Sequence, residues 1–132
     1  ILKGREIIII NLTQHKATPE QQTVGVVDLE GDALEELIEC LTFKDLPDAE
    51  EIHARVTGIV TLAVCWQEFV HAEAAMIGGA SWLIEPLTAA LKAKGIKPLF
   101  AFSARESIEQ TMPDGSVRKT AVFRHKGFVQ AL

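Results

Sequence analysis

Short apolar runs alternate along the chain with longer segments whose apolar residues recur at helical spacing. Ile7 to Ile10 is a continuous β-branched run. It is too short for a typical helix and typical of a strand covered on both faces. Val24 to Leu29, Ala74 to Ile77 and Ile96 to Phe102 are three further short extended segments. These runs predict the strands of one sheet.

Three helices are predicted between the first strands. Thr18-Pro19-Glu20-Gln21 is a capping box with proline at the first helical position, so a helix is expected to begin there. Asp32 to Leu41 and Ala49 to Ala72 carry apolar residues on one helical face. Gly58 weakens the long helix by about 1 kcal/mol relative to alanine. It indicates either a closely packed neighbour or a bend.

A fourth helix is predicted to end at Lys94, before Gly95. Ser81 is its possible cap. Pro86 removes a hydrogen bond and crowds the preceding turn. We therefore expect the regular helix to begin near Glu85, after an irregular lead-in.

The end of the chain predicts a β-hairpin. Pro113-Asp114-Gly115-Ser116 is a strong turn signal between extended segments at Ser107–Met112 and Val117–Phe123. The alternation of strands and helices before it predicts a single α/β domain over residues 1–132, with an open, mainly parallel sheet flanked by helices on both faces. Such sheets bind ligands beyond the carboxyl ends of their strands.

Three polar segments follow strands in this scheme. They contain Asn11, Thr13, Gln14 and His15 after the first strand, Gly78, Gly79 and Ser81 after the third, and Ser103, Arg105, Glu106 and Ser107 after the fourth. We expect the three segments to meet in one hollow that accepts an anion. The alternative is that these are ordinary polar loops.

Two of these segments suggest specific chemistry. Gly78-Gly79 lets the backbone approach a ligand, and amides at a helix start bind anions. The pair equally suits a tight turn, and it is neither a Walker loop nor GxGxxG. The imidazole of His15 can transfer protons near neutral pH. A lone loop histidine is also commonly just a polar residue.

Composition and charge narrow the classes of protein. The chain has 132 residues, of which 48% are hydrophobic, and a net charge of −5. This composition argues against disorder. Asp28 to Glu51 contains ten acidic residues and one basic residue, whereas Arg105 to Lys126 contains five basic and three acidic residues. An acidic chain with one basic section is suited to a small anion and not to long duplex DNA.

The sequence lacks the signatures of several other classes of protein. No apolar run reaches the roughly 18 residues of a membrane helix, so we expect a cytoplasmic protein with no membrane contact. Cys40 and Cys65 lie among helix-forming residues and have no CxxC spacing, so we expect two buried thiols in a reducing compartment. The sequence has no HExxH motif, Cys/His quartet or GxSxG elbow, so we expect no metal, no cofactor and no serine triad.

The first 21 residues resemble a known family. Ile8-Ile9-Ile10-Asn11-Leu12-Thr13-Gln14-His15, followed by Thr18-Pro19-Glu20-Gln21, is similar to the opening of the small stand-alone CRISPR-associated ring nucleases. Met76 to Phe102 resembles their later half in layout. The acidic stretch at residues 28–51 and the terminal hairpin have no obvious counterpart.

The resemblance implies a Rossmann-like (CARF-like) fold that forms a homodimer and binds a cyclic oligoadenylate across the dimer axis. It also implies metal-independent cleavage as a phosphodiesterase-type ring nuclease, in which a ribose 2′-hydroxyl attacks the adjacent phosphate. By position, Asn11, Thr13 and His15 would line the reacting phosphate. The other ligand-binding residues would be Gln14, Gly78, Gly79 and Ser81, to which the sheet-edge argument adds Ser103 and Arg105.

Two alternatives remain at the level of sequence. One is a nucleotide sensor or sponge that binds without turnover, since binding and cleavage need the same donors. The other is a homo-oligomeric structural or interaction protein of a mobile element. Trp66 and Phe69 on the long helix suit such an interface, and they suit a core equally.

Overall fold

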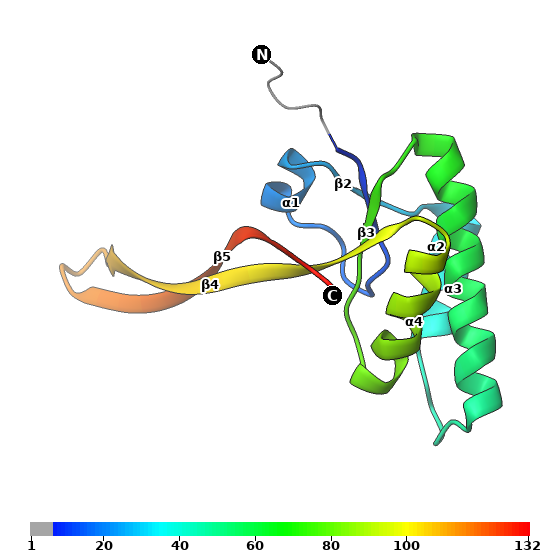
Figure 1. Cartoon of the computed structure of the whole chain (residues 1–132). Helices are drawn as coiled ribbons and strands as arrows, with labels where there is room; N and C mark the ends of the chain where they lie inside the picture. Colours follow the sequence, from blue (N-terminus) through cyan, green and yellow to red (C-terminus); the bar gives the residue numbers. More distant parts are fainter. Residues whose placement is uncertain (1–6) are drawn as a thin grey trace, which may run out of the picture.

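A computed structural model describes residues 7–132, which form a mixed α/β fold around one sheet. The sheet has five strands in the order β2-β1-β3-β4-β5. The first four are mutually parallel, and β5 runs antiparallel to β4 (Figure 1). The predicted mainly parallel sheet with a C-terminal hairpin is confirmed. The strands are β1 (Ile9–Asn11), β2 (Val26–Asp28), β3 (Ala74–Met76), β4 (Lys97–Thr111) and β5 (Val117–Gln130).

Four helices connect the strands, and the first three begin within one residue of their predicted starts. They are α1 (Pro19–Thr23), α2 (Gly31–Leu41), α3 (Ala49–Val70) and α4 (Ser81–Ala93). The capping box at α1 is confirmed, because the Thr18 hydroxyl accepts from Gln21 N at 3.1 Å and Gln21 Oε1 accepts from Thr18 N at 3.0 Å. Asp48 caps α3 by accepting from Glu51 N at 2.9 Å.

The helices divide unequally between the two faces of the sheet. Helices α2, α3 and α4 pack on one face, where Ile10, Leu37, Ile59 and Leu87 are fully buried in the main apolar core. The opposite face carries a smaller core beside the short α1, which itself buries no residue (Figure 1). No helix in residues 7–132 is long and apolar enough to cross a membrane.

Helix α4 differs from its predicted form. Pro86 lies inside a helix that is regular from Ser81 onward, so the expected irregular lead-in is wrong. Leu83, Leu87 and Leu91 are buried on one face of α4. Their packing offsets the hydrogen bond that proline cannot donate.

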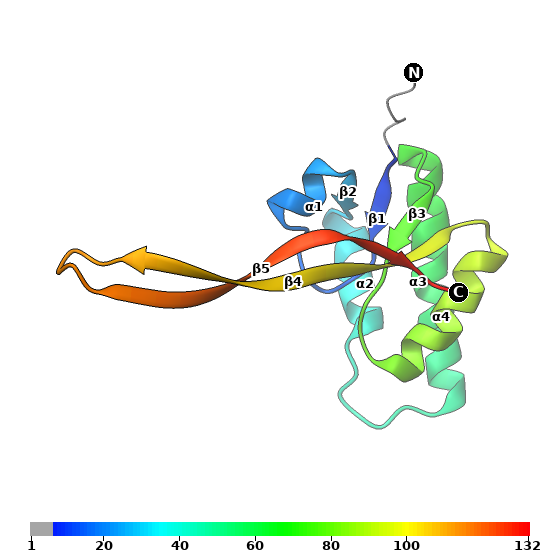
Figure 2. The same ribbon diagram turned by 60° about the vertical axis from the view of Figure 1, so that its left-hand side comes forward.

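The hairpin is also longer than its sequence pattern indicates. The prediction that residues 103–106 form a loop before the hairpin is wrong, because β4 continues through them and each pairs with a residue of β5. The two strands leave the body of the molecule as a projecting ribbon (Figure 2). Both faces of that ribbon are largely exposed, so its residues lack the apolar alternation by which a strand is recognised.

Gly58 in α3 is explained by a close neighbour. A Cβ at this position would lie 2.9 Å from Cys40 Sγ on α2, closer than real Cβ contacts. We expect Gly58→Ala to lower the free energy of unfolding by about 1 kcal/mol despite its better helix propensity. In a Cys40→Ala background the same substitution should instead stabilise the protein by about 0.5 kcal/mol. Urea unfolding of the native chain, the two single variants and the double variant measures the coupling free energy between positions 40 and 58. Strictly additive effects would contradict the packing explanation.

Candidate functional site

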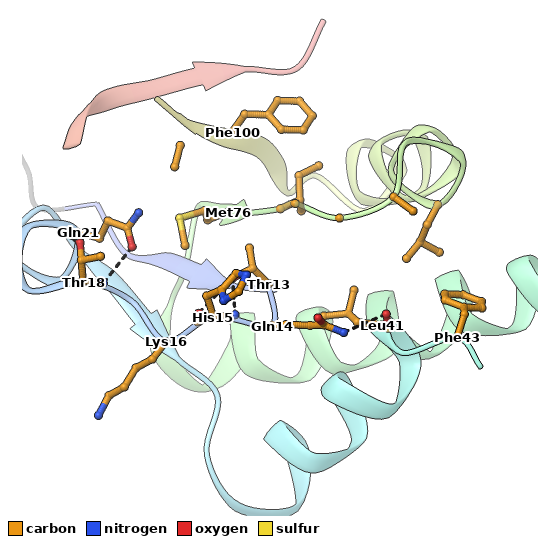
Figure 3. A pocket seen from close by; sticks show the side chains of 16 residues that line it. Thr13, Gln14, His15, Lys16, Thr18, Gln21, Leu41, Phe43, Met76 and Phe100 are labelled. Carbon is orange, nitrogen blue, oxygen red and sulfur yellow. Dashed lines mark hydrogen bonds between the residues drawn. The ribbon is translucent and has the colours of Figure 1, made fainter. Parts of the chain in front are cut away.

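A cavity of about 540 Å³ opens beyond the carboxyl ends of β1 and β3 (Figure 3). The connection after β1 leads to β2 on one side, and the connection after β3 leads to β4 on the other. This reversal of strand order is where open α/β sheets bind their ligands. The cavity is lined by Thr13, Gln14, His15, Lys16, Thr18, Gln21, Leu41, Phe43, Met76, Ile77, Gly78, Gly79, Ala80, Leu83, Phe100 and Ala101.

The side chain of Asn11 holds the loop that forms one wall. Its Nδ2 donates to His15 O at 2.7 Å and to Asp28 Oδ1 at 2.8 Å. Its Oδ1 accepts from Thr13 N at 2.9 Å and from the Thr13 hydroxyl at 2.7 Å. These bonds use both amide hydrogens and both oxygen lone pairs. Asn11, only 3% exposed, therefore lies beneath the loop as a positioning residue and does not line the cavity.

The loop supported by Asn11 presents its other polar residues to the cavity. The Thr13 hydroxyl accepts from His15 N at 3.2 Å, which fixes the two residues relative to each other. The His15 side chain is exposed and makes no hydrogen bond to other residues in the described part of the chain. Gln14 Nε2 donates to Leu41 O at 3.1 Å and so ties the loop to the end of α2. Figure 3 shows the Lys16 side chain pointing away from the centre of the cavity.

The glycine loop forms the facing wall. A Cβ at Gly78 would lie 3.6 Å from Thr13 Cγ2, so the two predicted loops do come together. Gly79 has φ +141°, a conformation that favours glycine. Gly78, Gly79 and Ala80 lead directly into α4.

The amino terminus of α4 is not capped by a side chain. Ala80 is the N-cap residue and its carbonyl accepts from Leu83 N and Ile84 N, both at 3.0 Å. The prediction of Ser81 as a cap is wrong, because the helix begins one residue earlier than that role requires. Ser81 instead lines a neighbouring apolar hollow that shares Gly78 and Gly79. The uncapped first turn offers backbone N–H groups to an anion.

The third predicted segment does not reach the cavity. Ser103 and Arg105 lie in the projecting part of β4, opposite His125 and Phe123 of β5. The β4 residues that do line the cavity are Phe100 and Ala101. The expectation that all three polar segments meet in one hollow is therefore correct for the segments after β1 and β3. It is wrong for residues 103–107, because β4 does not end at Phe102.

Sequence reasoning missed the apolar wall and the second polar rim. Met76, Leu83 and Phe100 form apolar surface, and Thr18 and Gln21 add polar groups from the start of α1. The capping box marked Thr18 and Gln21 as a helix start. Because that helix follows β1 directly, its start had to lie near the same edge of the sheet.

The cavity differs in charge from the chain as a whole because no acidic residue lines it. No carboxylate lines it, and Lys16 and His15 are its only basic residues, although the whole chain carries a charge of −5. Residues 7–132 contain no group of three or more His, Cys, Asp or Glu that could hold a metal ion. The arrangement can therefore bind a molecule that has both an apolar part and an anionic part.

A family model described as "Uncharacterized protein MJ1673 family" matches residues 7–129. No curated protein and no solved structure matches the chain.

Proposed function

The chain belongs to the MJ1673 family, and we propose that its cavity binds a cyclic oligoadenylate and cleaves it without a metal ion. The proposal rests on one observation above all. An acid-free cavity combines the uncapped start of α4 with Thr13 and His15 on one side and an apolar wall on the other. Phosphate fits the first group of features, and an adenine base fits the wall at Met76 and Phe100.

The similarity of residues 8–21 to the ring nucleases selects this ligand among nucleotides. The strand order and the parallel β1 to β4 support a Rossmann-like, CARF-like classification of the fold. A ring of several nucleotides is larger than one cavity of about 540 Å³, so one linkage enters while the rest stays outside.

The proposed reaction is an intramolecular transesterification. The ribose 2′-oxygen forms a bond to the adjacent phosphorus, and the bond from phosphorus to the 5′-oxygen breaks. The proton of the 2′-hydroxyl leaves, and the 5′-oxygen takes up a proton. The products end in a 2′,3′-cyclic phosphate and a 5′-hydroxyl.

The residues of the cavity match the needs of this step. His15 is the only imidazole at the cavity and carries the proton transfer. The N–H groups at the start of α4 stabilise the charge that develops on phosphate oxygens. The Thr13 hydroxyl, whose hydrogen goes to Asn11 Oδ1, holds the loop that carries His15. Asn11 contributes indirectly by fixing Thr13 and the backbone of His15.

Incubation of the protein with labelled cyclic tetra-adenylate in EDTA tests the proposal. We expect linear products with 2′,3′-cyclic phosphate ends. The matched control is the deoxyribose ring, which lacks the attacking hydroxyl and should bind without being cut. Retention of both rings without cleavage would favour the non-catalytic sensor. Failure to bind either ring would overturn the proposal and favour the interaction protein.

A further inference from the structure

The projecting ribbon has an open edge on β4. Strand β3 pairs with β4 only from Lys97 to Leu99, so β4 from Phe100 to Thr111 is paired on one side alone, with β5. A two-stranded ribbon is marginally stable in water, and an unpaired edge is a template for another strand. We call this stretch, Ser103 to Thr111, the β4 edge.

The direction of the backbone groups along the β4 edge follows from the sheet. Lys97 N donates to Glu73 O and Leu99 O accepts from Ile77 N, so odd-numbered residues face the β3 side. Met112 N donates to Ser116 O, so even-numbered residues face β5. The irregularity near Phe102 places its extra residue in β5 and leaves the alternation of β4 intact. Five residues therefore direct free N–H and C=O groups outward: Ser103, Arg105, Ser107, Glu109 and Thr111.

These five residues form a self-complementary series. We propose that the β4 edge pairs antiparallel with the β4 edge of a second copy of this chain, with Ser107 on the two-fold axis. Arg105 then lies opposite Glu109 of the partner subunit, and Ser103 lies opposite the partner's Thr111. The axis repeats each contact, so the interface contains two reciprocal ion pairs within one continuous antiparallel ladder.

Charge selects this register over its neighbours. Moving the axis to residue 106 or 108 places Arg105 opposite serine or threonine, and moving it to Arg105 itself opposes two guanidinium groups. Neither Arg105 nor Glu109 has an ion pair with another residue in the 7–132 range, although Lys119 lies opposite Glu109 in the β4–β5 ladder. The edge of β5 is a poor alternative, because β5 carries Arg118, Lys119, Arg124 and Lys126 and no acid.

The proposed dimer keeps the two cavities apart. Ala101 at the cavity rim is six residues from Ser107, which at about 3.3 Å per residue is about 20 Å. The two cavities would thus be separated by about 40 Å, and each would take its own ligand. The interface holds whether or not the cavity is catalytic, and it differs from a dimer that shares one ring.

Charge reversal on the intact chain tests the interface. Arg105→Glu and Glu109→Arg each turn both ion pairs into like-charge pairs, so we expect a dissociation constant raised roughly 10- to 100-fold in sedimentation velocity. The double variant R105E/E109R restores opposite charges and should restore the dimer. Arg118→Glu, on the β5 side of the same ribbon, is the matched control and should leave it unchanged.

Cross-linking tests the register independently. Cys65 is exposed, contrary to the expectation that both thiols are buried, so the experiment uses a Cys65→Ser background. Burial raises the pKa of the Cys40 thiol, which reduces its reactivity. Ser107→Cys places two thiols across the axis, where the Cα separation of about 5.5 Å suits a disulfide. We expect covalent dimers under mild oxidation with Ser107→Cys and none with Thr111→Cys.

The proposal is overturned if the native chain stays monomeric at about 100 μM. It is also overturned by a dimer that R105E and E109R leave intact, since the interface would then lie elsewhere. The Arg105–Glu109 pairing would be excluded if the native chain dimerises but R105E, E109R and the double variant all stay monomeric, while circular dichroism shows that each variant is folded.

Discussion

Replacement of His15 by alanine is expected to slow cleavage of cyclic tetra-adenylate by about 100- to 1000-fold while binding weakens little. Proton transfer by a positioned side chain contributes a factor of this size to a rate. The His15 imidazole is exposed at the cavity and makes no bond to other residues of the described chain, so its loss leaves the fold unchanged. Single-turnover rates with excess protein measure the chemical step directly.

The control for this experiment is another histidine on the surface. His53 lies on the exposed side of α3, away from the cavity, and His53→Ala should retain the native rate. Equal rates for the native chain and the His15→Ala variant would remove His15 from the reaction. A loss of binding as large as the loss of rate would assign His15 to ligand binding instead.

Replacement of Asn11 by aspartate is expected to lower the free energy of unfolding by about 3 kcal/mol at neutral pH. The change keeps the shape of the side chain but puts an oxygen where Nδ2 now donates to Asp28 Oδ1 at 2.8 Å and to His15 O at 2.7 Å. Two carboxylates then face each other at a site where Asn11 is 3% exposed, and an unpaired buried charge costs several kcal/mol. For a chain of this length, the melting temperature should fall by about 10 °C.

The pH dependence of this variant gives a second readout. The neighbouring Asp28 carboxylate raises the pKa of the introduced carboxyl in the folded state, so the folded chain binds the proton more tightly than the unfolded chain. The stability difference from the native chain should therefore shrink as the pH falls. Gln14→Glu is the control, because its amide bonds to Leu41 O at the surface and the cost should stay below about 1 kcal/mol. Equal costs at the two positions would refute the positioning role of Asn11.

The sequence predicted those parts of the fold in which burial or capping of side chains leaves a pattern along the chain. The apolar run ending at Ile10, the α1 capping box and the periodic α3 each leave a local pattern in the sequence, and the structure has an element at all three. Strand β1, however, begins at Ile9 and not at the exposed Ile7. The length of β4 could not be predicted in this way. Beyond Phe102, β4 is held by backbone pairing to β5 while both of its faces are exposed, so its side chains carry no pattern.

The candidate site was predictable to a similar extent. The rule that ligands bind beyond the carboxyl ends of strands brought the loops at Thr13 and Gly78 together correctly. The rule could not predict that Asn11, unlike Thr13 and His15, lies outside the cavity. Its side chain turns inward and donates hydrogen bonds to His15 O and Asp28 Oδ1. The roles of Met76 and Phe100 as cavity walls depend on how deep the cavity is, which residue order does not encode.

Strand β4 contributes both to the cavity and to the projecting ribbon. Its first part supplies Phe100 and Ala101 to the cavity, and its last part ends at the turn that begins with Met112. The hydrogen-bonded ladder of β4 and β5 thus runs from the cavity to the far tip, with one register shift between Phe102 and Ser103. If a ligand in the cavity changes the affinity of the proposed dimer, dimerisation must change the affinity for that ligand by the same free energy.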